Sequence, residues 1–476
     1  MSIPAVSPLR QLANIISDSV DKIDQICQSA KCDYPSLDAP FNPGSPSEGL
    51  ALTPEVIQNA SLIVAACSQL SSTVNIPALS LYDAIGGFHV ASALRAALES
   101  NTVEILRQSP NGLKTTEIAA INGMDPTRIA RLLRLLATHH IFAEVEPDVF
   151  KNNRLSSLMD TLKSVDEITA SPENKHVDTP GMSALIEHTG DEVFKGSAFM
   201  TDVLLDPVSG HSEAPEHAPL CVAFKTNKPS WEWYEEPENA FRLKRFAAAM
   251  AGSAKLDPPN AILQGFNWAE LPANSLVVDV GGGIGHTTLK IVQSNPNLKY
   301  IVQDRPPVVQ QATEFWKANN PSALETGTVK LIAHDFFTPQ PDNKVAVFLC
   351  RMVMHDHGRN TAAAILRNLR SAASSDTKLL IVDQIVPYAC PDKNALAIEE
   401  NIPGAKQPVP PKPLLTNLGK ANAIAYLGDL QMYVGLNGEE RTLGSFLELT
   451  RSTGWKIIKV FTIPGSMHKQ ILAIPA

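Results

Sequence analysis

A glycine-rich turn that follows an apolar run offers the clearest chemistry in this sequence. The run Leu276 to Val278 ends in Asp279, and residues 280–285 read Val-Gly-Gly-Gly-Ile-Gly. A β-branched run of this length is typical of a strand buried on both faces, and glycines let the backbone turn sharply and approach a ligand at the N-terminus of the next helix. We therefore expect a cradle for a nucleotide-type cofactor, with Gly281 and Gly283 in it.

The residues around this cradle favour one cofactor over another. A dinucleotide site requires a further glycine where this chain has Thr288, and it rarely has an acid at the end of the first strand. A second predicted strand, 299–303, leads into Asp304, whose carboxylate can accept hydrogen bonds from both hydroxyls of a ribose. An acid on the first strand, three glycines and an acid that closes the second strand resemble the S-adenosyl-L-methionine site of class I methyltransferases.

A strand predicted over 345–350 delivers a candidate base to the same sheet edge. It leads into Arg351 and then His355-Asp356-His357. Methyl transfer from a sulfonium is an in-line displacement that needs an oxygen nucleophile and little other covalent chemistry. A phenol has a pKa of about 10 and a histidine one of about 6.5, so a neighbouring imidazole raises the reactive phenolate fraction during attack. We expect His355 to be this base, although a histidine after a strand is more often structural.

These motifs together resemble the plant and fungal small-molecule O-methyltransferase family over about residues 80–476. The family hallmark is a histidine-aspartate pair after the fourth strand, here His355-Asp356. Its closing signature is matched by Asp429 to Met432 and by the run Asn437 to Thr442. The resemblance implies a Rossmann-like, doubly wound α/β domain that binds S-adenosyl-L-methionine, preceded by a mainly helical, winged-helix dimerisation domain.

The resemblance also implies roles for individual residues. It places Asp383 and Glu440 as carboxylates that flank the catalytic histidine. It makes Asp335 the acid of the adenine site, sets Phe336 against the base, and makes Arg351 a basic residue that holds the cofactor. The chain departs from the family at His357, where an aromatic residue is common, and at Asp383, which is one methylene shorter than the glutamate of many plant members.

Bulk composition limits the classes of function. The chain has 476 residues, 44% of them hydrophobic, and a formal net charge of −9. This acidity provides no basic field for nucleic acid or an acidic membrane surface. Six scattered cysteines without metal-ligand spacing indicate reduced thiols and no metal site. With no signal-like N-terminus and no long apolar segment, we expect a cytoplasmic protein.

The order of patterns predicts four parts of the chain. Residues 1–50 should hold an amphipathic helix, 8–28, and a linker. Residues 51–180 should form the dimerisation domain, residues 181–270 a helical segment that walls the substrate, and residues 271–476 the cofactor domain. The predicted sheet is parallel except for its last strands. A proline-rich interruption, 390–417, is expected to be a surface loop.

Two predictions concern the dimerisation domain. A helix from Thr53 to Leu70 should turn an apolar side toward a partner, and this side consists of Ile57, Ala60, Val64 and Cys67. Two helices and a two-stranded wing over 116–150 look like a winged helix-turn-helix, which binds either DNA or a second subunit. We favour a homodimer, because the chain is acidic, although Arg128, Arg131 and Arg134 could contact DNA.

Three functions remain open from the residues alone. The first is an O-methyltransferase of fungal secondary metabolism that acts on a phenolic or enolic small molecule, such as a polyketide. The second is an enzyme of the same fold that has exchanged methyl transfer for a pericyclic or other reaction. The third is a winged-helix regulator, which needs a basic surface. The presence of His355 with both flanking acids favours the first.

Overall fold

A seven-stranded sheet forms the centre of the C-terminal half of the computed structural model, which describes residues 6–341, 344–392 and 401–476. The strand order is β6-β5-β4-β7-β8-β10-β9, and only β10 runs antiparallel to its neighbours. This confirms the predicted doubly wound sheet; of the two closing strands that were expected to be reversed, β10 is reversed, whereas β9 again runs in the direction of the others. The strands are β4 (Leu276–Val280), β5 (Lys299–Asp304), β6 (Val329–Ala333), β7 (Val345–Arg351), β8 (Lys378–Asp383), β9 (Trp455–Thr462) and β10 (Lys469–Pro475).

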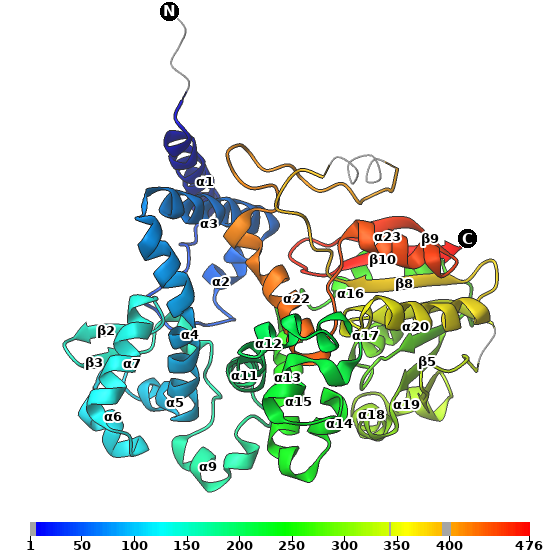
Figure 1. The fold of residues 1–476 in the computed structure, drawn as a ribbon, viewed down its shortest axis with the longest axis horizontal. Helices are drawn as coiled ribbons and strands as arrows, with labels where there is room; N and C mark the ends of the chain where they lie inside the picture. The colour runs from blue at the N-terminus through cyan, green and yellow to red at the C-terminus, as the bar shows by residue number, and fades with distance from the viewer. Residues whose placement is uncertain (1–5, 342–343, 393–400) are drawn as a thin grey trace, which may run out of the picture.

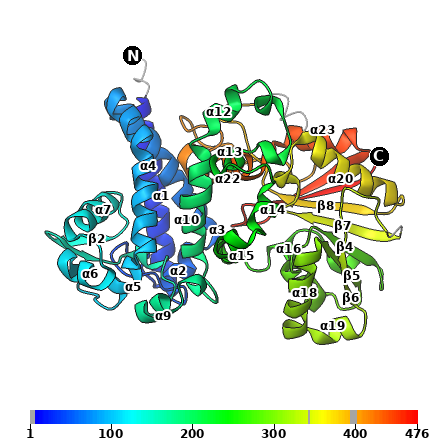
Figure 2. The ribbon, with the colours of Figure 1, turned by 60° about the horizontal axis from the view of Figure 1, so that its bottom comes forward.

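Helices cover both faces of this sheet (Figures 1 and 2). Alternate residues of each strand, such as Val277 and Val278, enter two separate apolar cores. One core packs the strands against α16, α17 and α18, and the other packs them against α20 and α23. The helices of this half are α16 (Ala261–Gln264), α17 (His286–Ser294), α18 (Pro306–Asn319), α19 (Pro321–Glu325), α20 (Arg359–Ala372), α22 (Ala423–Leu436) and α23 (Leu443–Ser452).

The N-terminal part is mainly helical, with a small sheet of order β1-β3-β2. This sheet and helices α4 to α7 share one apolar core. Helix α1 packs against α3 through Leu12, Ala65 and Ala66, so the predicted division after residue 50 separates two helices that lie together. The elements are α1 (Pro8–Ala30), α2 (Pro46–Ala51), α3 (Pro54–Val74), α4 (Pro77–Glu99), α5 (Thr102–Arg107), β1 (Leu113–Lys114), α6 (Thr115–Asn122), α7 (Pro126–Thr138), β2 (Ala143–Glu146), β3 (Val149–Lys151), α8 (Arg154–Ser157) and α9 (Val165–Ala170).

Within the chain, helix α3 is buried along a different side from the predicted apolar one. The buried side of α3 consists of Val56, Asn59, Ala65 and Ala66, whereas Val64 and Cys67 of the predicted side are exposed. Small residues are buried there because they let α1 approach closely. The polar stretch 159–180 contains α9, whose first turn is capped by the Ser164 hydroxyl.

Short helices connect the two halves, and one charged cluster joins them to α4. The buried Arg245 of α15 pairs with Asp191 and Glu192, and Arg95 of α4 pairs with the same Asp191. These carboxylates lie on a π-helical turn, Thr189–Val193, that follows α10. The helices are α10 (Met182–His188), α11 (Phe194–Ser197), α12 (Met200–Leu205), α13 (Pro219–Phe224), α14 (Ser230–Tyr234) and α15 (Ala240–Ser253).

The proline-rich segment between β8 and α22 is less superficial than predicted. Ile402 and Ala405 are buried in the core beside α23, and Leu414 is buried against α1 and α3. Residues 393–400 of this segment lie outside the described residues. None of the helices in the described part of the chain is long and apolar enough to cross a membrane.

Candidate active site

The glycine-rich turn connects β4 to the N-terminus of α17 with little room for side chains. Gly281 has φ +67°, and a Cβ there would lie 2.9 Å from Val353 Cγ2. Gly283 has φ +59°, and nothing lies within 4 Å of the position of its Cβ, so its outer side is open. The turn therefore needs glycine at both predicted positions. At Gly281 both the positive φ and the contact with Val353 require it, and at Gly283 the positive φ alone does.

Asp304 lies directly beside this turn, at the end of β5. Its Oδ2 accepts a hydrogen bond from the Gly283 amide at 2.8 Å, and its Oδ1 accepts one from the Arg305 amide at 2.8 Å. The residue is half-buried, so its remaining lone pairs face the open side of the turn. A carboxylate in this setting fits the diol of a ribose.

Asp279 lies beneath the turn. Its carboxylate accepts a 2.5 Å hydrogen bond from the Thr288 hydroxyl of α17, and a Cβ on Gly282 would lie 2.6 Å from it. Burial raises the pKa of Asp279 to about 6. Asp279 therefore connects the turn to α17, and its direct contact with a cofactor stays a prediction.

Asp335 and Phe336 follow β6 on the same edge of the sheet. Asp335 Oδ1 accepts a hydrogen bond from the Phe337 amide at 2.9 Å. The ring of His357 lies 5.6 Å from the rings of both Phe336 and Phe337, at nearly perpendicular angles. Burial lowers the pKa of His357 to about 4, and Arg441 adds to this shift, so the ring is neutral at physiological pH. His357 therefore packs as the aromatic residue whose place it takes.

His355 lies in a short 3₁₀ turn, Met354–Asp356, directly after β7. Its Nδ1 is 2.7 Å from Glu440 Oε1, and its Nε2 is 3.4 Å from Asp356 Oδ1. The Glu440 amide donates to Asp429 Oδ1 at 2.9 Å, which holds the closing signature against α22. The fold thus brings together the predicted pair of His355 and Glu440, which are 85 positions apart in the sequence.

Asp383 lies in the same buried region without a partner. It is fully buried, and neither carboxylate oxygen has a hydrogen-bond partner in the described ranges. Burial raises the pKa of Asp383 to about 7, although the charge of His355 opposes that shift. The shorter side chain leaves this position without the hydrogen bond to His355 that the family resemblance implies, and Asp356 is the second carboxylate close to the imidazole.

The three carboxylates change the protonation of His355. Burial alone would lower the pKa of this histidine, but the charge of Asp356, the hydrogen bond that His355 donates to Glu440 and the charge of Asp383 raise it to about 10. The expected pKa of about 6.5 is therefore too low for this chain. An imidazole of this basicity matches a phenol, whose pKa is also about 10.

Arg441 clamps the turn that carries His355, which the sequence patterns did not predict. Its guanidinium donates to the carbonyl oxygens of Met354, at 2.5 Å, and His357, at 2.6 Å. The side chain is buried, and the carboxylates of the site lie close enough to affect its pKa. The only sequence signal was its place after Glu440 in the closing signature.

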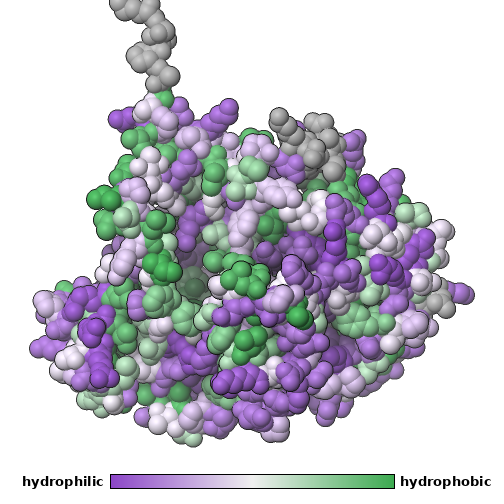
Figure 3. Space-filling view, in the orientation of Figure 1, coloured by the Kyte–Doolittle hydropathy of each residue, from purple (hydrophilic) through white to green (hydrophobic). Residues whose placement is uncertain are grey.

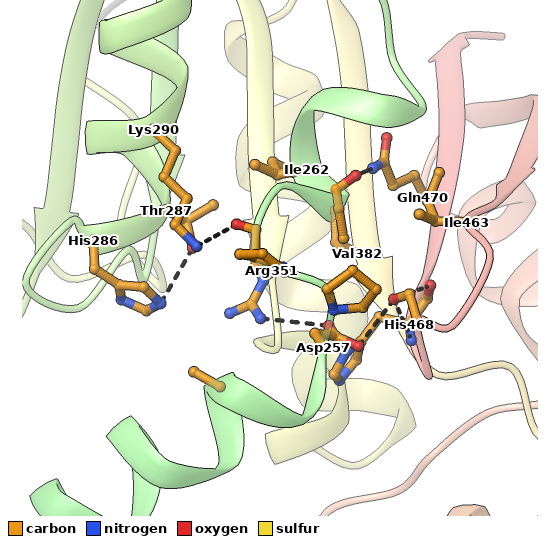
Figure 4. Close-up of a pocket in the computed structure, with 15 residues that line it drawn as sticks. Asp257, Ile262, His286, Thr287, Lys290, Arg351, Val382, Ile463, His468 and Gln470 are labelled. Carbon is orange, nitrogen blue, oxygen red and sulfur yellow. Dashed lines mark hydrogen bonds and ion pairs between the residues drawn. The ribbon is translucent and has the colours of Figure 1, made fainter. Parts of the chain in front are cut away.

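Arg351 lines a small cavity beside α16 and α17, together with Asp257 and His468 (Figure 4). Its Nη2 lies 3.8 Å from Asp257 Oδ2, and His468 Nδ1 lies 2.6 Å from the same oxygen. His286 at the start of α17 lines the same cavity. Burial lowers the pKa of His286 to about 4, and the charge of Arg351 contributes. Arg351 therefore has Asp257 as its ion-pair partner in this cavity, and its contact with the cofactor stays a prediction.

Comparison with known proteins agrees with this arrangement. Residues 227–400 match the model of an O-methyltransferase domain, and residues 82–161 match that of an O-methyltransferase dimerisation domain. The chain is 38% identical to an O-methyltransferase of Armillaria gallica, over 98% of this chain and 99% of that protein. It is 39% identical to 4-O-methyltransferase 1 of Phanerochaete chrysosporium, over 99% of this chain and 100% of that protein.

Solved structures show the same fold at low sequence identity. Mitomycin 7-O-methyltransferase MmcR superposes with a TM-score of 0.61 and 20% identity, covering 84% of this chain and 98% of that chain. LepI in complex with SAM superposes with a TM-score of 0.65 and 18% identity, covering 98% and 100%. The predicted class I fold and cofactor are thus confirmed. The chain therefore belongs to the family of S-adenosylmethionine-dependent O-methyltransferases.

Proposed function

We propose that this enzyme methylates a hydroxyl of a phenolic or enolic small molecule, with His355 as the general base. The observation that carries the proposal is the buried pair His355 and Glu440, 2.7 Å apart, at the sheet edge that also holds the glycine-rich turn. S-adenosylmethionine supplies the methyl group from its sulfonium. Gly281, Gly283 and Asp304 would bind the ribose and the methionine part of the cofactor, and Asp335 and Phe336 would bind its adenine.

The protein's own part in the reaction is to take the acceptor's proton and to orient the base. Glu440 accepts from Nδ1 of His355 and stabilises the imidazolium that forms, so the nitrogen that would take the acceptor's proton is Nε2, which lies 3.4 Å from Asp356 Oδ1. With pKa values of about 10 on both sides, proton transfer between phenol and imidazole is nearly balanced. A cationic cofactor bound beside His355 would lower the pKa of the imidazole and so favour its neutral, proton-accepting form.

Two contacts of the segment 181–270 support the proposal that this segment forms a wall over the site. Residues 212–214 lie against the closing signature, because Asn437 donates to the carbonyl oxygens of Ser212, at 2.8 Å, and Ala214, at 2.9 Å. Arg305, next to Asp304, pairs with Glu235 at 2.9 Å. Several aromatic side chains of the segment pack on one another around Trp233 and Tyr234, so these rings belong to its core.

We also propose a homodimer built on the N-terminal helices, within the four-part division predicted for the chain. Large apolar side chains are exposed from the end of α3 along α4, and Figure 3 shows hydrophobic surface on this side of the molecule. They are Val74, Ile76, Leu79, Leu81, Tyr82, Ile85 and Phe88. The adjacent match to a dimerisation domain supports this use. All six cysteines are free, which supports the cytoplasm as the proposed location.

The names of the fungal relatives support hydroxyl methylation, and secondary metabolism is proposed on the same ground. A direct test supplies S-adenosylmethionine with a panel of phenols and their methyl ethers. We expect S-adenosylhomocysteine and methyl ether in equal amounts from some of the phenols, and neither from substrates without a free hydroxyl. Conversion of an acceptor without S-adenosylhomocysteine would instead support the pericyclic alternative, for which the solved structure of a pericyclic reaction enzyme provides a precedent of the same fold only.

A further inference from the structure

A second cavity lies outside the His355 site, where the proline-rich segment meets α3, α22 and the β9–β10 loop (Figure 1). Its volume of about 580 Å³ is that of a site for a small molecule. The walls are mainly apolar side chains, and they include Ile57, Ile385, Val386, Pro410, Ala425 and Leu443. Three further apolar side chains that line it, Tyr388, Val409 and Ile424, are exposed.

The cavity is preformed, because hydrogen bonds hold its walls from several elements. Thr416 Oγ1 donates to the Tyr388 carbonyl at 3.1 Å, and the Tyr426 hydroxyl of α22 donates to the Pro387 carbonyl. The Val386 amide donates to the Arg441 carbonyl at 3.0 Å. Proline at positions 387, 391, 408 and 410 further restricts the backbone around the cavity. A ligand would therefore meet an ordered surface rather than have to order it.

Among the described residues that line this cavity, Lys469 is the only cationic one. It lies at the start of β10, directly opposite Asp383 in the strand register, and lines the cavity. Its ammonium makes no hydrogen bond and no ion pair with any residue in the described ranges 6–341, 344–392 and 401–476. Burial lowers the pKa of Lys469, as expected of an ammonium held among apolar groups. The other charged residue of the lining, Asp392, has an interaction of its own.

We propose that this cavity is a second small-molecule site, which binds an apolar or aromatic acid through an ion pair between its carboxylate and Lys469. The apolar walls would enclose the hydrocarbon part, and the anion would supply the partner that the ammonium lacks. The site is separate from the methyl-transfer centre, since neither His355 nor any of the glycines of the cofactor turn lines it. The proposal does not depend on the proposed methyl transfer.

Binding of 1-naphthoate to the full-length protein, measured by calorimetry, tests the proposal without an activity readout. Lys469→Met should weaken binding roughly tenfold or more, and Lys469→Arg should restore most of it. Gly444→Leu provides a second test from another wall, because Gly444 lines the cavity and a Cβ there meets only Thr442 Oγ1, at 3.6 Å. This variant should fold and exclude the probe. Neutral 1-naphthalenemethanol should bind the parent and Lys469→Met alike.

His355→Ala and saturating S-adenosylhomocysteine are the controls for location, and both should leave 1-naphthoate binding unchanged. Loss of binding in either would place the probe in the methyl-transfer centre and overturn the proposal. Equal affinity of the parent, Lys469→Met and Gly444→Leu would also overturn it. A further contrary result is a Lys469→Met protein that loses turnover but not probe binding, because Lys469 would then serve the neighbouring Asp383.

Discussion

At the scale of single residues, His355 lies among three carboxylates, and this setting decides its response to pH. The pKa of about 10 means that the neutral, proton-accepting form increases as pH rises above neutrality. Glu440→Gln removes a negative charge and a hydrogen-bond acceptor from the imidazolium, which lowers its pKa. We expect the rising limb of the kcat–pH profile to move to lower pH by roughly one to two units, with a lower plateau.

The matched control is the neighbouring Glu439→Gln, because Glu439 is half-exposed and pairs with Arg441 rather than with His355. Its profile should stay close to that of the parent. Identical profiles for the parent and Glu440→Gln would contradict the assignment of Glu440 as the partner that raises the pKa.

For Asp383, we expect a substitution that removes the charge to stabilise the folded protein and to lower its turnover. Its pKa of about 7 in the folded protein is above its value of about 3.9 in the unfolded chain, so its ionisation destabilises the fold progressively as pH rises above the lower value. Asp383→Asn should therefore raise Tm at pH 8 and have little effect at pH 4, while it lowers turnover. Thermal unfolding at both pH values measures this. An asparagine variant that is less stable than the parent at pH 8 would show that Asp383 has a stabilising partner.

The sequence predicted the pair of His355 and Glu440 but not the local arrangement around it. Family motifs contain both residues, and strand order brings them to one edge. The 3.4 Å approach of Asp356 depends on the 3₁₀ turn after β7, which has no signature of its own. The basicity of His355 could not be predicted either, because it follows from the burial of carboxylates that are distant in sequence.

At the scale of elements, the strands were predictable because they are buried apolar runs that end in polar residues. Helices α19 and α23 were not predicted, since α19 is short and α23 follows directly from the closing signature. The predicted apolar side of α3 differs from the side that α1 covers, because close packing with α1 buries the small residues Ala65 and Ala66. Periodicity identified the helix but not its partner.

Arg441 connects the elements of the site, and we expect its two-pronged guanidinium to be needed to hold the turn that carries His355. It holds two carbonyls of the His355 turn, and lysine cannot reach both with fixed geometry. Arg441→Lys should lower Tm and reduce kcat roughly tenfold or more, with cofactor affinity near that of the parent. Arg451→Lys, at the exposed end of α23, is the control. Parental kcat and Tm in Arg441→Lys would mean that the turn holds its shape without the fork.

At the scale of the whole molecule, the exposed apolar side of α4 should be covered by a second copy of the chain. A charge at the centre of this surface has no partner when buried, so Ile85→Glu should shift the protein to monomer. Gln311→Glu on the exposed side of α18 adds the same charge and should stay dimeric. Sedimentation velocity at micromolar concentration distinguishes them. A monomeric parent would contradict the proposed dimer, as would a soluble, active protein that lacks residues 1–100.

The most direct test of methyl transfer with His355 as the base is a single turnover with S-adenosylmethionine that carries a labelled methyl group, in the parent and in His355→Gln. The parent should transfer the label to the acceptor hydroxyl and release one S-adenosylhomocysteine per product. His355→Gln should bind the cofactor with parental affinity and transfer the label roughly 100-fold more slowly or less, because only the step that moves the proton loses its base. Transfer at the parental rate by His355→Gln, or an acceptor consumed without label in the product, would contradict the central claim.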